Sequence, residues 1–173
     1  MSPVVEVVRT YLELDSLAQL RPARFDDPAV RVVQRTPIDN AHYRRLYDTV
    51  GDGWHWTDRR AWSEDRLATH LARSAISVFE CLVAGESAGF FELERHPDGA
   101  VEIAYFGLTA PFIGRGLGKA LLTRAAEDAF ALGADRVWLH TCTLDSPHAL
   151  PNYQSRGFTP FKRETYVLQL PLS

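Results

Sequence analysis

Alternating hydrophobic and polar residues predict strands at both ends of the chain. Residues 4–14, VVEVVRTYLEL, follow the period of two that is typical of a strand. Residues 30–36, VRVVQRT, predict a second strand, which Pro37 closes. Residues 165–170 alternate in the same way and predict the last strand. The stretch between the first two strands is rich in proline and aspartate, which favours a loop from Asp15 to Pro28.

Apolar residues at helical spacing predict four helices. They are expected over residues 38–51, 63–75, 119–132 and 148–155. Ser63 is a typical helix N-cap, because its hydroxyl oxygen can accept a hydrogen bond from a free backbone N–H. Gly133 and Gly157 follow the last two helices, and glycine favours the left-handed conformation in which helices often end.

Four further runs of β-favouring residues complete the prediction. Residues 76–83, 88–94 and 101–108 are separated by short turns and predict an antiparallel meander, and residues 136–141 predict a buried strand. The resulting order, β-β-α-α-β-β-β-α-β-α-β, predicts an α/β (α+β) fold with a mixed, mostly antiparallel central sheet flanked by helices. We expect a single domain over residues 1–173.

Composition narrows the classes of function. The chain has 173 residues and a net charge of -3, so it lacks the basic excess that is typical of nucleic-acid-binding proteins. No run approaches the roughly 20 apolar residues needed to span a bilayer, and no secretory leader is visible, so we expect a cytoplasmic protein that does not bind membranes. Cys81 and Cys142 lie in predicted strands and are expected to be free thiols.

A glycine-rich turn at the start of the third predicted helix carries the main chemical signal. Residues 102–125 contain a strand, a proline loop, the sequence Gly-Arg-Gly-Leu-Gly and the start of a helix. Backbone N–H groups at a helix N-terminus bind anions, and a pyrophosphate is the natural ligand. The NTPase phosphate loop does not match, because Ala120 follows Lys119 where Ser or Thr is required. The dinucleotide fingerprint does not match either, because Lys119 occupies the position of its third glycine.

Residues 113–118, IGRGLG, resemble the acetyl-CoA-binding motif [R/Q]-x-x-G-x-[G/A] of the GNAT (Gcn5-related N-acetyltransferase) superfamily. Ile113 departs from the motif, which has a basic or amide residue there. The predicted order of elements is also similar to that superfamily's fold, with an extra N-terminal strand. The resemblance implies acetyl-CoA as co-substrate, with its diphosphate bound by Gly114, Arg115, Gly116, Leu117, Gly118 and Lys119.

In GNAT folds the strand before this loop separates from its parallel neighbour and binds the pantetheine arm. The resemblance therefore implies contacts from Phe106, Gly107 and Leu108, with the Leu108 N–H polarising the thioester carbonyl. The alternative is an ordinary core strand in which Gly107 marks a bulge.

Tyr153 lies in a segment, YQSRGF, that resembles the family's Y-x-x-x-G-F, in which the tyrosine hydroxyl points at the CoA sulfur. This implies that Tyr153 is the general acid, since a phenol can protonate a thiolate. The alternative is a tyrosine that only packs beside Phe158. Many relatives have an asparagine seven or eight residues before this tyrosine, where the present chain has Asp145 and Ser146, and Ser146 is the expected cofactor contact.

Glu102 is the candidate general base, at the offset where the histone-acetyltransferase branch of the superfamily has its catalytic glutamate. Strand alternation predicts that Glu102, Ala104, Phe106 and Leu108 share one face. Because Glu102 lies several residues from Leu108, we expect it to act through water. Glu92 on the neighbouring strand competes for the role, and a solvated surface carboxylate is the other alternative.

An aromatic loop between the first two helices predicts the acceptor site. Trp54, Trp56 and Asp58, together with Glu92, are the expected contacts of an amine substrate, because aromatic rings and carboxylates bind cations. The alternative is that the tryptophans close the core and Asp58 pairs with Arg59 or Arg60. His140 and Cys142 would share one face of a strand, but no second pair of ligands is apparent, so no metal is expected.

The leading hypothesis is therefore an N-acetyltransferase that transfers acetyl from acetyl-CoA to a primary amine by direct attack in a ternary complex. The acceptor, a small molecule or peptide, is left open, because fold similarity does not determine substrate. The alternative is a non-catalytic acyl-CoA-binding or sensing module, which Ile113 and the Asp145-Ser146 pair favour. A homodimer is also expected from the resemblance.

Overall fold

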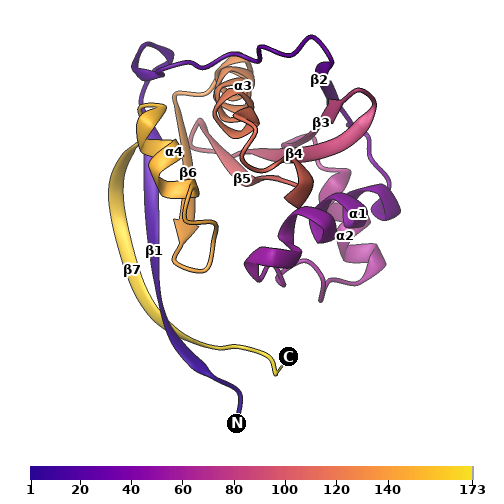
Figure 1. Cartoon of the computed structure of the whole chain (residues 1–173), viewed down its shortest axis with the longest axis vertical. Coiled ribbons are helices and arrows are strands. Elements are labelled where there is room, and N and C mark those ends of the chain that lie inside the picture. The colour runs from indigo at the N-terminus through magenta and orange to yellow at the C-terminus, as the bar shows by residue number, and fades with distance from the viewer. Residues whose placement is uncertain (173) are drawn as a thin grey trace.

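The computed structural model describes residues 1–172, which form one seven-stranded mixed sheet with helices on both faces (Figure 1). The strands are β1 (Val4–Leu14), β2 (Val30–Gln34), β3 (Ile76–Val83), β4 (Glu86–Arg95), β5 (Ala100–Leu108), β6 (Arg136–Cys142) and β7 (Thr159–Gln169). The helices are α1 (Asn40–Gly51), α2 (Glu64–Leu71), α3 (Leu117–Ala131) and α4 (Ala149–Ser155).

The sheet confirms the predicted α+β class. Its strand order is β2-β3-β4-β5-β6-β1-β7, and every neighbouring pair is antiparallel except β5 and β6. The N-terminal strand β1 lies inside the sheet, between β6 and β7. The last strand is longer than predicted, because β7 begins at Thr159 and pairs along most of β1.

Two of the helix starts follow from their capping residues. The Asp39 carboxylate accepts a hydrogen bond from the His42 N–H at the start of α1, and the Ser63 hydroxyl accepts one from the Arg66 N–H at the start of α2. Helix α3 begins at Leu117, two residues before the predicted start. Helix α2 ends at Leu71, so Ala75 lies outside it, contrary to the prediction.

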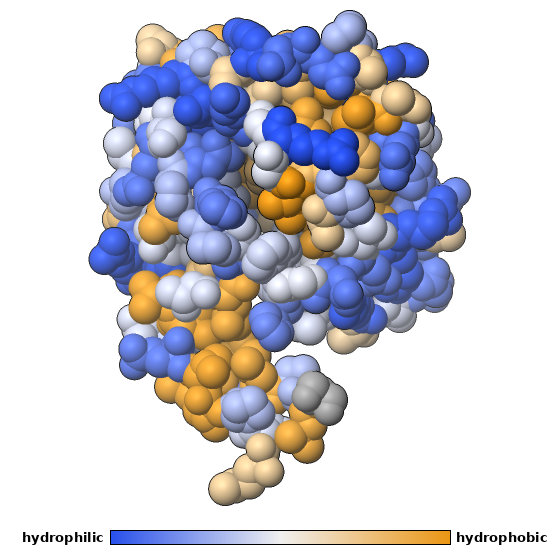
Figure 2. All heavy atoms as spheres, in the orientation of Figure 1, coloured by the Kyte–Doolittle hydropathy of each residue, from blue (hydrophilic) through white to orange (hydrophobic). Residues whose placement is uncertain are grey.

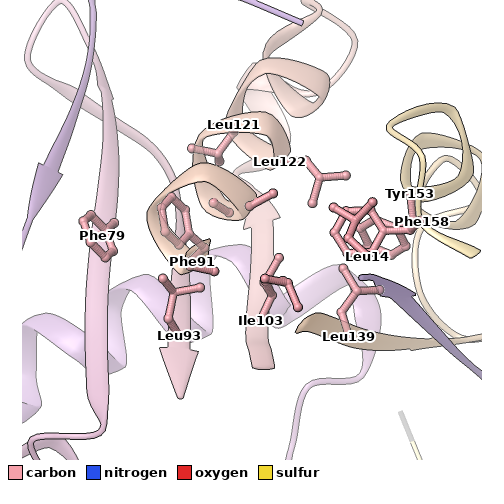
Figure 3. Packing of buried hydrophobic residues seen from close by; sticks show 14 of the residues in the cluster. Leu14, Phe79, Phe91, Leu93, Ile103, Leu121, Leu122, Leu139, Tyr153 and Phe158 are labelled. Atoms are coloured by element: carbon pink, nitrogen blue, oxygen red, sulfur yellow. The ribbon is translucent and has the colours of Figure 1, made fainter. Parts of the chain in front are cut away.

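Two apolar cores lie on opposite faces of the sheet. The larger one fills the space between the sheet and helices α3 and α4, and Figure 3 shows its packing. Its fully buried side chains include Leu14, Phe91, Leu121 and Leu139. The smaller core packs α1 and α2 against the other face, around Tyr43, Leu67 and Phe90. The central strands are therefore covered on both sides, which fixes the position of β5 between the two cores.

Strands β1 and β7 continue beyond the body as a two-stranded ribbon, in which the start of β1 pairs with the end of β7 (Figure 1). This projecting part is largely apolar (Figure 2), and Val4, Val167 and Leu172 are each at least 65% exposed. The homodimer expected above, to which the N-terminal strand would contribute, stays a prediction. Within residues 1–172, no helix is both long and apolar enough to cross a membrane.

Candidate active site

Strands β5 and β6 separate from one another after a short parallel contact. They pair only where Ala100–Glu102 face Arg136–Trp138. Beyond this point β5 continues to Leu108 without pairing to β6, and a cavity of about 690 Å³ opens between the two strands. Residues of both strands line it, including Phe106 and His140. This is the strand separation that the GNAT resemblance implied.

Backbone groups of β5 are free to bind a ligand in the gap. The Thr109 N–H donates to the carbonyl oxygen of Ala88 in the adjacent strand β4, at 2.9 Å. Because successive N–H groups of a strand point to opposite edges, the N–H groups of Leu108 and Phe106 turn toward the gap. Phe106, Gly107 and Leu108 all line the cavity.

A β-bulge in β5 overturns one prediction. Glu92 of β4 pairs with Tyr105 and Leu93 pairs with Ile103, so Ala104 is the extra residue. Tyr105 packs against the core under α1 and α2, whereas Phe106 and Leu108 pack against the core under α3. The bulge reverses the alternation of side chains. Glu102 therefore does not share a face with Phe106 and Leu108, and the prediction that it does is wrong.

The glycine-rich turn forms an anion-binding helix start at the end of this gap. Gly114 and Gly116 have positive φ values of 82° and 77°, a conformation that favours glycine. Gly116 caps α3 without any side-chain hydrogen bond, so the first N–H groups of the helix remain available to a ligand. The predicted contacts Gly114, Gly116, Gly118 and Lys119 line the cavity. The Arg115 side chain instead covers the Phe112 ring, and the Leu117 side chain is buried.

Tyr153 of α4 reaches the same cavity from the other side. Its side chain is buried between the rings of Phe106 and Phe158, with centroids 6.2 and 6.3 Å away. Burial raises the pKa of the Tyr153 hydroxyl, which therefore keeps its proton. Among residues 1–172 it has no hydrogen-bond partner. Tyr153 thus packs beside Phe158, as one interpretation held, and also offers a hydroxyl group to the cavity.

Neighbouring polar residues fix the loop before α4 and its contact with α3. The Asp145 carboxylate accepts hydrogen bonds from the Thr141 hydroxyl and the Cys142 N–H, at 2.7 and 2.9 Å. Ser146 lines the cavity, and its contact with the cofactor stays a prediction. Asn152 was missed by the sequence analysis; its side-chain amide donates to the Gly118 carbonyl at 3.3 Å. The one sequence signal for Asn152 was its position directly before Tyr153.

The predicted aromatic residues lie at the other end of the cavity. Trp54, Trp56 and Asp58 all line it. Trp56 also packs on Tyr105, with ring centroids 4.9 Å apart, so it both closes the core and faces the cavity. Within residues 1–172 Asp58 forms no ion pair, because Arg59 and Arg60 bind Glu92 and Asp48 instead. The interpretation in which Asp58 pairs with a neighbouring arginine is therefore wrong.

Glu92 lies outside the cavity, contrary to the prediction that it contacts the acceptor. Its side chain is 0% exposed. The carboxylate accepts hydrogen bonds from Arg59, from the Tyr43 hydroxyl at 2.6 Å and from the His70 ring at 3.0 Å. Burial alone would raise the pKa of Glu92, but these donors and the Arg59 charge hold it below its ordinary value. Glu92 joins α1, α2 and the aromatic loop to β4.

Glu102 lines the cavity near the point where β5 and β6 separate. Its side chain is 13% exposed and accepts a hydrogen bond from His96 Nε2 at 2.9 Å. Burial raises the pKa of the Glu102 carboxyl above its ordinary value. Glu102 is therefore not the solvated surface carboxylate of the alternative interpretation.

Further cavity residues lie in elements that the sequence predicted, but nothing in the sequence pointed to their contact with a ligand. They include Arg9, Tyr47, Tyr105, Tyr166 and Leu168. His140 and Cys142 also line the cavity, on the side of β6. Burial raises the pKa of the Cys142 thiol, which disfavours the reactive thiolate form.

An α+β sheet in which two parallel strands separate beside a helix N-terminus is the fold of the Gcn5-related N-acetyltransferases. A family model described as "Acetyltransferase (GNAT) family" matches residues 40–158, and the chain belongs to this family. The matched segment contains the glycine-rich turn and the Tyr153 segment.

Individual relatives agree with this assignment. A mycothiol acetyltransferase of Corynebacterium efficiens is 30% identical over 116 residues, which are 65% of this chain and 39% of that protein. A Gcn5-related N-acetyltransferase from Kribbella flavida has a similar structure, with a TM-score of 0.65 and 19% identity over 98% of this chain and 61% of its own. An IAA acetyltransferase from Bacillus cereus has a TM-score of 0.58 and 22% identity, covering 77% of this chain and 79% of its own. The chain therefore spans about two fifths of the mycothiol acetyltransferase.

Proposed function

We propose that the chain is an N-acetyltransferase that transfers the acetyl group of acetyl-CoA to a primary amine by direct attack in a ternary complex. The observation that carries the proposal is the shared cavity. The gap between β5 and β6, the N-terminus of α3 and Tyr153 all border it. Membership of the GNAT family supports the same conclusion.

The residues along the gap fit coenzyme A. The N–H groups at the start of α3 and the ammonium group of Lys119 would hold its diphosphate, because a helix N-terminus and a cation both favour negative charge. The N–H groups of Phe106 and Leu108 would bind the pantetheine arm as an added strand does. Bound acetyl-CoA supplies an activated acetyl thioester. Ile113 offers no polar side chain, so the backbone N–H groups and Lys119 would carry the phosphate contacts.

Three groups of the chain fit the proton and charge movements of acetyl transfer. The Leu108 N–H would stabilise negative charge on the carbonyl oxygen. Tyr153 Oη would donate its proton to the departing thiolate. The Glu102 carboxylate would accept, through water, the proton that the substrate ammonium group must lose before its nitrogen can attack the thioester carbonyl. Direct attack by the amine needs no protein nucleophile, which agrees with the raised pKa of Cys142.

The opposite end of the cavity fits an amine acceptor. Trp54 presents an aromatic surface there, and Asp58 presents a carboxylate without an ion-pair partner within residues 1–172. Aromatic faces and carboxylates attract ammonium groups. The names of the relatives also point to amine acceptors, since one is a mycothiol acetyltransferase and a similar structure is an aminoglycoside acetyltransferase with sisomicin bound, at 15% identity and a TM-score of 0.61.

Two measurements separate this proposal from the sensing module. Calorimetry with CoA and acetyl-CoA tests binding, and release of free thiol from acetyl-CoA tests turnover with primary amines of several classes. We expect both binding and thiol release. Tight binding without thiol release across the panel indicates a sensor, and absence of binding contradicts both functions.

Gly116→Ala should weaken CoA binding about tenfold, the effect of losing one hydrogen bond to a charged group. The alanine strains a backbone with φ of 77° and shifts the turn that begins α3. Gly133→Ala is a matched control at the far end of the helix, with φ of 88° and open space around it. Both variants should lose similar thermal stability, but only Gly116→Ala should change the dissociation constant. Equal affinities in the two variants contradict a phosphate site at the turn.

The fall of kcat/KM at acid pH should follow the protonation of the Glu102 carboxylate. Because a base must be ionised to accept a proton, kcat/KM should fall about tenfold per pH unit below the pKa of Glu102. Burial raises that pKa, so the midpoint should lie above the value of about 4.3 that is usual for glutamate. Glu102→Gln should remove this limb of the profile. If the limb persists in Glu102→Gln, Glu102 is not the base.

A further inference from the structure

We infer that His96 is a positioning residue for the proposed base, and that its imidazole holds the Glu102 carboxylate in place at the cavity wall. The inference rests on the proposed function. It begins with the hydrogen bond of 2.9 Å between His96 Nε2 and Glu102 Oε1. His96 does not line the cavity, whereas Glu102 does. His96 therefore acts on the reaction through Glu102.

The strand pairing explains why a donor is needed at this place. Glu94 of β4 lies directly opposite Glu102 of β5, and two like charges in that position repel one another. Arg73 binds Glu94 Oε1 at 2.6 Å and balances that charge. His96 Nε2 lies 3.7 Å from the other Glu94 oxygen and bonds directly to Glu102. Each carboxylate thus has its own basic partner.

The hairpin between β4 and β5 keeps the imidazole in this position. The His96 N–H donates to the Ala100 carbonyl at 2.9 Å, and the Gly99 N–H donates to the His96 carbonyl at 3.1 Å. The imidazole also packs against the Trp138 ring of β6, with centroids 5.6 Å apart. Backbone bonds and ring packing together restrict the ring, so its hydrogen bond also restricts the orientation of the Glu102 carboxylate.

The charged groups around Glu102 determine how His96 should change the pKa of the Glu102 carboxyl. The hydrogen bond and the charge of His96 favour the ionised carboxylate, and the charges of Glu94 and Glu92 oppose it. From β6 the residue that pairs with Glu102 is the uncharged Trp138. Loss of the His96 donor should therefore raise the pKa of Glu102, by about one unit for one hydrogen bond to a charged group.

Two amide substitutions at His96 provide a matched test. In His96→Gln the side-chain nitrogen lies as many bonds from the backbone as Nε2, so it can still donate to Glu102. In His96→Asn the side-chain nitrogen corresponds to Nδ1, and the side chain is too short to bring it to the Glu102 carboxylate. We expect the acid limb of kcat/KM to lie about one unit further to higher pH in His96→Asn than in His96→Gln, because the glutamine keeps the hydrogen bond and loses only the charge of His96. Equal limbs in both variants, or an equal loss of kcat/KM at every pH, overturn the inference.

A measurement without turnover keeps this inference separate from the proposed function. The Glu102 carboxyl can be titrated directly by NMR in the 173-residue chain with ¹³C-labelled glutamate carboxyl groups, using Glu102→Gln to identify its signal. The titration midpoint of Glu102 should rise further in His96→Asn than in His96→Gln, because only the asparagine loses the hydrogen bond as well as the charge of His96. An unchanged midpoint overturns the positioning role, even if the protein acetylates amines. A shifted midpoint in a protein that releases no thiol supports the contact and contradicts the proposed function instead.

Discussion

Tyr153→Phe should lower kcat about 100-fold, at the lower end of the range for general acid catalysis, and leave the dissociation constant of CoA nearly unchanged. The substitution removes only the hydroxyl group. The ring that packs between Phe106 and Phe158 is kept, so the cavity wall should hold its shape. Because burial raises the pKa of Tyr153, the wild-type hydroxyl carries a proton across the neutral range and can donate it. Steady-state thiol release and calorimetry with CoA measure the two quantities.

Tyr11→Phe is the control for this experiment. Tyr11 also has a hydrogen-bonding hydroxyl, which donates to Glu164 at 3.0 Å, but it does not line the cavity. Its loss should leave kcat close to wild type. A kcat in Tyr153→Phe that matches wild type removes the acid role. A parallel loss of CoA affinity instead makes Tyr153 a binding residue.

Local sequence signals predicted most of the elements. The caps Asp39 and Ser63 act within one helical turn, and Ser63 marked its helix start in the sequence. The glycine-rich turn was also recognisable, because positive φ at Gly114 and Gly116 requires a residue type that sequence shows directly. These features depend on neighbours a few residues away. A short segment of sequence is therefore enough to predict the geometry of these features.

Features that depend on distant pairing were not predicted. The bulge at Ala104 arises from the register between β4 and β5, and alternation along β5 alone gives the wrong face for Glu102. The cavity contributions of Arg9 and Tyr166 depend on β1 and β7 pairing across most of the chain. Asn152 likewise acquires its role only when α4 packs beside α3. In each case the partner lies too far along the sequence for a local pattern to reveal it.

The buried network around Glu92 also depends on residues that are distant in the sequence, and it leads to a prediction on stability. Four donors and acceptors meet there from separate elements: Tyr43 from α1, Arg59 from the aromatic loop, His70 from α2 and Glu92 from β4. In the sequence Glu92 was one carboxylate on a strand. In the fold it is the residue that ties the cavity's aromatic loop to the sheet, since Arg59 lines the cavity and also binds Glu92.

Glu92→Ala should lower the free energy of unfolding by roughly 3–5 kcal/mol, because it leaves the buried Arg59 charge without its partner. Denaturant unfolding at pH 7 measures this loss. Asp48→Ala is the control, since it removes one partner of an exposed ion pair with Arg60 and should change stability little. If Glu92→Ala lowers the free energy of unfolding as little as Asp48→Ala does, the burial of the Arg59–Glu92 pair does not matter for stability.

The pH dependence of the loss follows from the direction of the pKa shift. The pKa of Glu92 is lower in the folded chain than in an unfolded one, so the folded state binds fewer protons in the interval between the two values. The stability that Glu92 contributes is therefore present above the ordinary glutamate pKa and disappears as the pH falls through the folded value. The difference in the free energy of unfolding between wild type and Glu92→Ala should narrow toward acid pH.

Replacing Arg59 and Glu92 together by leucine should recover part of the lost stability, because an apolar pair leaves no unbalanced buried charge. If the double variant loses as much stability as Arg59→Leu and Glu92→Leu lose in sum, the ion pair does not account for the stability of this region.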